Sequence, residues 1–122
     1  GDELDPNPKF ELLTSSPYAN PSSISFRMRS RSSRTDEVEK VRRWNWTLNA
    51  GAGGYDVANL MSHATTNAYN VWTASYAGVL TDYLQAGTGY IIVEISQTPI
   101  SEVDGFDGWN GSWDSVRWTI NP

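Results

Sequence analysis

Hydrophobic and polar residues alternate in steps of two along several stretches of the chain, which is the period of a half-buried β-strand. The segment SISFRMRSR (23–31) puts its apolar residues on one side and its arginines on the other. Near the C-terminus, DSVRWTI (114–120) places Asp114 on the same side as Val116 and Trp118. The same period predicts strands over 9–14, 41–49 and 69–76.

The most continuous apolar run is YIIVEIS (90–96), which predicts a central strand covered on both faces and ended by Pro99. Turn residues in 32–37 would join 23–31 and 41–49 as an antiparallel pair. Arg27, Arg29 and Arg43 would then share one face of that pair.

A helical spacing of apolar residues follows Asp56 and predicts a helix of one or two turns, capped by Asp56, over 57–64. Six or more short strands separated by turns predict an all-β fold, either an antiparallel β-sandwich or a jelly-roll-like barrel, with at most this one short helix. The length of 122 residues suits one domain. Residues 1–8, with their acidic and proline residues, are expected to be a linker from an upstream domain, and 9–122 a single β display domain.

The net charge of −5 conceals a basic segment, because 27–43 holds seven of the nine basic residues against three acidic ones. Arginines in such a segment suit phosphate or sulfated glycans. The alternative is that the arginines line the solvent-exposed face of the strands and form ion pairs with nearby acidic groups. Since nucleic-acid-binding domains tend to be basic overall, no nucleic-acid partner is expected.

The absence of cysteine excludes disulfides, thiolate zinc sites and cysteine nucleophiles. No run of 18 apolar residues exists, so no membrane insertion is expected.

Residues suited to catalysis are few, and we expect no enzyme and no catalytic residue. The single histidine, His63, could be drawn into a triad with Ser62 or Ser75, but no Gly-x-Ser-x-Gly motif accompanies it. Glu94 could form a carboxylate pair of the kind that glycosidases use, but any acidic β-protein offers such pairs. No cofactor is expected; Asp104 and Asp107 are the candidates for a calcium site, although aspartates beside glycines more often form turns.

The sequence favours a binding function over catalysis, because six tryptophans and six tyrosines exceed what a small core needs. The glycine-rich loop before the last strand carries Phe106, Trp109 and Trp113, and Tyr55 also has a glycine neighbour. We expect these rings, with Arg27, Arg29 and Arg43, to be candidates for a binding or dimer interface. The alternative is that each ring fills an end of the core.

The acidic leader GDELDPNPKF, the cysteine-free β domain and the terminal WDSVRWTINP together resemble the protruding domain of shrimp and prawn nodavirus capsid proteins. The resemblance implies a viral spike at the virion surface, made in the host cytoplasm. It would be tethered by the leader to the capsid shell domain, paired as a homodimer and presented to a host-cell receptor or glycan. It implies no catalytic residues, and calcium in that family belongs to the shell.

The same features also fit a carbohydrate-binding module of a bacterial enzyme or surface protein. A spike should pair through an apolar patch, whereas a carbohydrate module should present two or three coplanar rings in a groove. A small glycosidase or peptidase is a third class, which would need two carboxylates converging in a cleft.

Overall fold

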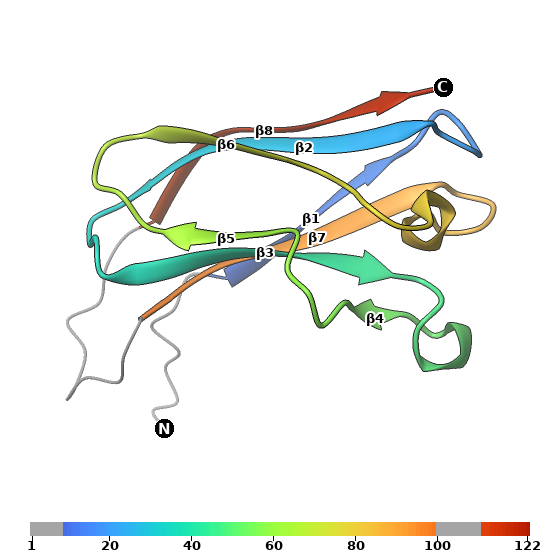
Figure 1. Cartoon of the computed structure of the whole chain (residues 1–122), viewed down its shortest axis with the longest axis horizontal. Coiled ribbons are helices and arrows are strands. Elements are labelled where there is room, and N and C mark those ends of the chain that lie inside the picture. The colour runs from blue at the N-terminus through green and yellow to red at the C-terminus, as the bar shows by residue number, and fades with distance from the viewer. Residues whose placement is uncertain (1–8, 100–110) are drawn as a thin grey trace.

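Two antiparallel β-sheets pack face to face in the computed structural model of the chain, which describes residues 9–99 and 111–122 (Figure 1). The five-stranded sheet has the order β1-β7-β3-β4, with β5 also paired to β3, and the three-stranded sheet has the order β6-β2-β8. The expected all-β sandwich is confirmed. Its strands are β1 (Lys9–Ser15), β2 (Ser23–Ser32), β3 (Glu37–Asn45), β4 (Gly54–Tyr55), β5 (Met61–Ala64), β6 (Asn70–Ser75), β7 (Tyr90–Pro99) and β8 (Gly111–Asn121).

The core lies between the central strands of the two sheets. Ile24, Phe26 and Met28 on β2 face the other sheet, whose β7 contributes Ile91, Val93 and Ile95, and all six side chains are fully buried. Burying each such side chain stabilises the fold by about 1.5–3 kcal/mol. The alternation in the sequence therefore states correctly which side of β2 is inside.

The predicted strand pairing between β2 and β3 is wrong. β3 begins at Glu37 rather than at residue 41, and it pairs with β7, β5 and β4, whereas β2 pairs with β6 and β8. The turn after β2 therefore crosses from one sheet to the other (Figure 1). The first half of β3 escaped prediction because its inward positions include Glu37 and Glu39, which are buried although charged.

The predicted helix over 57–64 is also wrong. Met61–Ala64 forms β5, which pairs with Val38–Val41 of β3. A segment this short pays the cost of helix nucleation without enough bonds to offset it, so pairing with an open strand edge prevails. The helical elements in the described part of the chain are two short 3-10 turns, η1 (Asn49–Gly51) and η2 (Leu80–Tyr83).

Asp114 does not share the inward face of β8. The register shifts between Arg29 and Ser30, so that Arg29 lies opposite Ser115 while Ser30 lies opposite Trp113. Asp114 is the extra residue of this β-bulge, and it turns to the outer surface. Alternation predicted the right face for Val116 and the wrong one for Asp114, because a bulge resets the period.

The central position of β7 is confirmed, since it lies between β1 and β3. Its outer face is covered only in part, since Glu94 and Ser96 there are each 8% exposed whereas Tyr90 is 40% exposed. The expected linker over 1–8 lies outside the described residues.

Candidate binding surfaces and a buried carboxylate network

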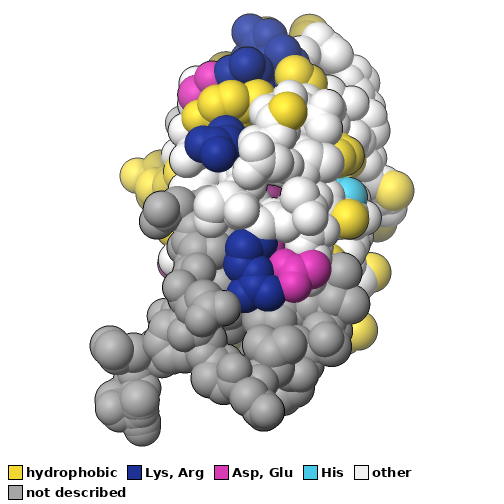
Figure 2. Space-filling model, turned by 90° about the vertical axis from the view of Figure 1, so that its left-hand side faces the viewer, with side chains coloured by type: hydrophobic (Ala, Val, Ile, Leu, Met, Phe, Trp, Pro, Cys, Tyr) yellow, Lys and Arg dark blue, Asp and Glu magenta, His cyan; other side chains and the backbone are white. Residues whose placement is uncertain are grey.

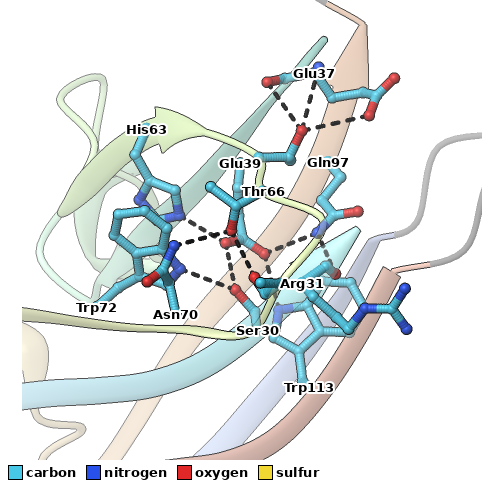
Figure 3. A network of polar contacts seen from close by, with 12 residues as sticks. Ser30, Arg31, Glu37, Glu39, His63, Thr66, Asn70, Trp72, Gln97 and Trp113 are labelled. Carbon is cyan, nitrogen blue, oxygen red and sulfur yellow. Dashed lines mark hydrogen bonds and ion pairs between the residues drawn. The ribbon is translucent and has the colours of Figure 1, made fainter. Parts of the chain in front are cut away.

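A buried glutamate joins the two sheets at the end of the sandwich where β2 runs into β3 (Figure 3). Glu39 on β3 is 1% exposed. From the three-stranded sheet its carboxylate accepts hydrogen bonds from Ser30 Oγ at 2.7 Å and Trp113 Nε1 at 3.0 Å. From its own sheet it accepts one from Gln97 Nε2 at 3.0 Å, and His63 Nε2 lies 2.7 Å away.

The hydrogen bonds decide the charge of Glu39. Burial alone would raise its pKa, but the hydrogen bonds from His63, Ser30 and Gln97 and the charge of His63 together hold that pKa below its usual value. The imidazole of His63 also stacks on Trp72, with ring centroids 3.5 Å apart. Ser30 donates to the carboxylate rather than to His63, so this group lacks the serine–histidine bond of nucleophilic catalysis. Its evident role is to fix the two sheets together.

Glu37, two residues before Glu39, is fully buried and behaves in the opposite way. Burial, followed by the hydrogen bond and negative charge of Asp36, raises the pKa of Glu37 to about 7. Arg34 Nε lies 2.8 Å from its carboxylate and offsets only part of this effect. The fold therefore stabilises the ionised form of one buried glutamate and the protonated form of its neighbour.

An arginine face covers the outer side of the three-stranded sheet; it consists of Arg27, Arg29 and Arg31 on β2 and Arg117 on β8. In Figure 2, basic side chains gather at the top, over this sheet. Arg29 forms an ion pair with Asp114, and its guanidinium lies 4.3 Å from the centre of the Tyr69 ring.

The expected clustering of Arg43 with Arg27 and Arg29 is wrong. Arg43 belongs to the other sheet and points into the sandwich, where its side chain is 11% exposed. It forms a 3.0 Å ion pair with Asp56, and its guanidinium lies 4.5 Å from the centre of the Tyr83 ring. Arg43 is a structural cation, whereas Arg27 and Arg29 lie on the surface as expected.

The outer side of the five-stranded sheet carries an apolar row, formed by Leu13, Ile92, Trp44 and Tyr55 on four neighbouring strands. Leu13 lies opposite Ile92 and Trp44 opposite Tyr55, while the register of β3 on β7 brings Trp44 beside Ile92. Leu13 is 58% exposed, and Tyr90, which lies two residues before Ile92 on the same outer side of β7, is 40% exposed. Ile92, Trp44 and Tyr55 are partly exposed, so the row forms a partly solvated apolar surface.

The aromatic end of the apolar row is held in place by close contacts. The rings of Trp44 and Tyr55 are 5.0 Å apart and nearly perpendicular, at 88°. Tyr55 also donates a hydrogen bond to Glu11. Gly53, with φ at +94°, lets the Trp44 ring lie against the backbone, because a Cβ there would come within 2.5 Å of Trp44 Nε1. Tyr55 is therefore at the surface, as expected, but as part of a sheet face rather than a loop.

Trp113 does not lie on an exposed loop. It is the third residue of β8, packs edge-on against Phe10 with ring centroids 4.7 Å apart, and donates to Glu39. Trp113 was a candidate for a binding or dimer interface, with filling an end of the core as the alternative; its ring is partly buried against the core, because the bulge at Asp114 keeps it on the inner side of β8. Phe106, Trp109, Asp104 and Asp107 lie outside the described residues.

Sequence reasoning missed the apolar row and Arg117. Ile92 was hidden within a strand that looked apolar on both sides, and Leu13 within a short first strand. Arg117 could have been predicted to lie on the outer surface, since alternation in 114–120 places it on the other face of the strand from Trp118. What alternation lacked was the pairing that sets Arg117 beside Arg27.

Within residues 9–99 and 111–122, no three His, Cys, Asp or Glu side chains come together as metal ligands. The same residues contain no helix with the length and hydrophobicity needed to cross a bilayer. Neither a protein-family model, nor a curated protein sequence, nor a solved structure matches this chain.

Proposed function

We propose that this chain is a non-enzymatic spike domain of a viral capsid, which pairs as a homodimer at the virion surface and mediates attachment to host cells. The observation that carries the proposal is the apolar row, because the exposed Leu13 lies in line with the partly exposed Ile92, Trp44 and Tyr55 on one sheet face, and such a patch suits an isologous interface. The all-β sandwich and the resemblance to nodavirus protruding domains support the same conclusion.

The size of the face sets the strength expected of the pairing. Three strands about 4.8 Å apart over the seven residues of β1, at about 3.3 Å each, together with the two residues of β4, give a projected area of roughly 360 Å² for each subunit. Two such faces bury roughly 700 Å² in total, less than the roughly 1,200 Å² of stable specific interfaces, as expected of a weak and transient pairing. We therefore propose a dimer that dissociates in the micromolar range and gains strength from the many copies on one particle.

The orientation of the rings counts against the carbohydrate-module alternative. A sugar-binding platform needs rings that are roughly coplanar, but Trp44 is nearly perpendicular to Tyr55 and lies at 71° to Trp46.

The pairing is tested by the variant Leu13→Ser, with Val71→Ser as the matched control. Both residues are exposed and apolar, at 58% and 47%, but Val71 lies on the outer side of the opposite sheet. Sedimentation velocity should show that Leu13→Ser weakens dimerisation about tenfold and that Val71→Ser leaves it unchanged. Equal effects of the two variants would refute pairing through the apolar row.

A further inference from the structure

Two arginines on the arginine face stand directly opposite each other on neighbouring strands. Arg27 on β2 is the cross-strand partner of Arg117 on β8, and such partners have Cβ atoms about 5 Å apart. Like charges in this position destabilise a sheet. An anion beside the two guanidinium groups would offset this repulsion, and it can come either from an acidic side chain or from a bound ligand.

The described part of the chain provides no such anion. Arg27 Nη1 donates to Ser115 Oγ at 3.3 Å, and none of the described carboxylates is paired with Arg27 or Arg117. The acidic residue on this face, Asp114, is engaged by Arg29. Among the residues that the structure describes, Arg27 and Arg117 are thus a pair of uncompensated positive charges, on a chain whose net charge is −5.

We propose that the arginine face binds a linear sulfated glycan, with Arg27 and Arg117 as the central sulfate contacts. The inference deepens the proposed function, since it names the class of molecule that attachment would use, and it rests on that function for its biological meaning. Guanidinium groups bind planar oxyanion edges through two N–H groups at once. Successive outward residues on β2 lie about 7 Å apart, so Arg27, Arg29 and Arg31 form a line along which an extended polyanion can run.

The neighbouring side chains favour a sugar over a nucleic acid. Hydroxyl residues flank the arginines on the same face, with Thr73 beside Arg27 on β6 and Ser25 opposite Thr119 one row further on. Single-stranded nucleic acids bind through aromatic rings on which bases stack. The one described ring at this face, Tyr69, is already covered by the Arg29 guanidinium at 4.3 Å.

The test measures binding of a fluorescent heparin decasaccharide to the 122-residue chain in 50 mM NaCl. The double variant R27Q/R117Q is compared with K9Q/K40Q, which removes the same two charges from the outer side of the other sheet, where both lysines line a shallow hollow. We expect R27Q/R117Q to weaken binding at least tenfold and K9Q/K40Q less than twofold, because exposed charge pairs act locally. Raising NaCl to 300 mM should weaken binding of the unaltered chain.

Equal losses in the two double variants would overturn the inference, because they would show attraction by net charge alone. If a hyaluronan decasaccharide, which lacks sulfate, bound with the same affinity as the heparin decasaccharide, the ligand would not be a sulfated glycan. Tighter binding of a uridine 20-mer than of heparin would exclude that ligand class as well. Absence of heparin binding in 50 mM NaCl would overturn the site itself. The sedimentation coefficient of each variant is measured in parallel, so glycan binding by a strict monomer would leave this inference standing while the proposed pairing fails.

Discussion

Replacing Glu39 by alanine should destabilise the fold more than any exposed substitution considered above. The change removes the acceptor for Ser30, Gln97 and Trp113 at once, together with the partner of His63. The donors come from both sheets, so the loss falls on the contact between the two layers.

The size of the effect follows from burial. Ser30 is 1% exposed, and leaving its buried hydroxyl without an acceptor costs about 1–3 kcal/mol, whereas Gln97 keeps its hydrogen bond to the Arg31 carbonyl. Breaking a buried charged network by removing one partner costs about 3–5 kcal/mol in total. For a domain of this size that loss corresponds to a fall in Tm of roughly 10–20 °C.

The comparison variant is Glu39→Gln, which keeps the shape of the side chain. Its carbonyl oxygen can still accept from Gln97 and Trp113, while its amide faces Ser30 Oγ and His63 Nε2, which can both act as acceptors. The expected cost is about 1–2 kcal/mol, measured by urea unfolding at pH 7. Values for the two variants within 0.5 kcal/mol of each other would refute the reasoning.

The pH dependence of the same pair provides a second check on Glu39. Its pKa is lowered in the folded state, so its contribution is present above the unfolded value of about 4.5 and is lost as the pH falls through the folded pKa. The stability difference between the unaltered chain and Glu39→Gln should therefore shrink below pH 4. A difference that stays constant from pH 7 to pH 3 would contradict an ionised Glu39.

Three further predictions concern single positions. The free energy of unfolding of Glu37→Gln should rise relative to that of the unaltered chain by about 1 kcal/mol per pH unit between pH 4.5 and pH 7. The reason is that Glu37, with a folded pKa of about 7, makes the unaltered chain lose stability as the pH rises through that window. A pH-independent difference between the two chains in urea unfolding would exclude this. Arg117→Thr should raise Tm by about 1–3 °C by removing a like-charged cross-strand pair, and calorimetry that finds a fall would show that the pair is compensated. Gly53→Ala should cost about 2–4 kcal/mol and Gly51→Ala only about 1, because both have positive φ but only the former meets Trp44; equal losses in thermal unfolding would show that the ring moves freely.

Alternation was a sound guide wherever one side of a strand is purely apolar. It identified β2, β6 and β8 and the inward faces of Phe26 and Trp118, because hydrophobic burial dominates those positions. It failed over the first half of β3, where Glu37 and Glu39 are buried and form hydrogen bonds with residues far along the chain: Thr65 is 28 residues from Glu37, and His63 is 24 residues from Glu39. The residues next to Glu37 and Glu39 in the sequence do not indicate which distant residues will contact them in the fold.

The surfaces were harder to predict than the strands. Which residues share an outer face depends on which strands pair, and the pairing of β2 with β8 rather than β3 is decided by contacts across the whole chain. This is why Arg27 and Arg29 were placed correctly on the surface while Arg43 was wrongly grouped with them. The same dependence concealed the apolar row, whose four members come from four strands.

The mass of the unaltered chain across a dilution series, by light scattering coupled to size exclusion, tests the central claim of pairing most directly. We expect twice the chain mass of 13.6 kDa at high concentration, falling toward 13.6 kDa in the micromolar range. A mass that stays at 13.6 kDa up to several hundred micromolar would contradict pairing through the apolar row.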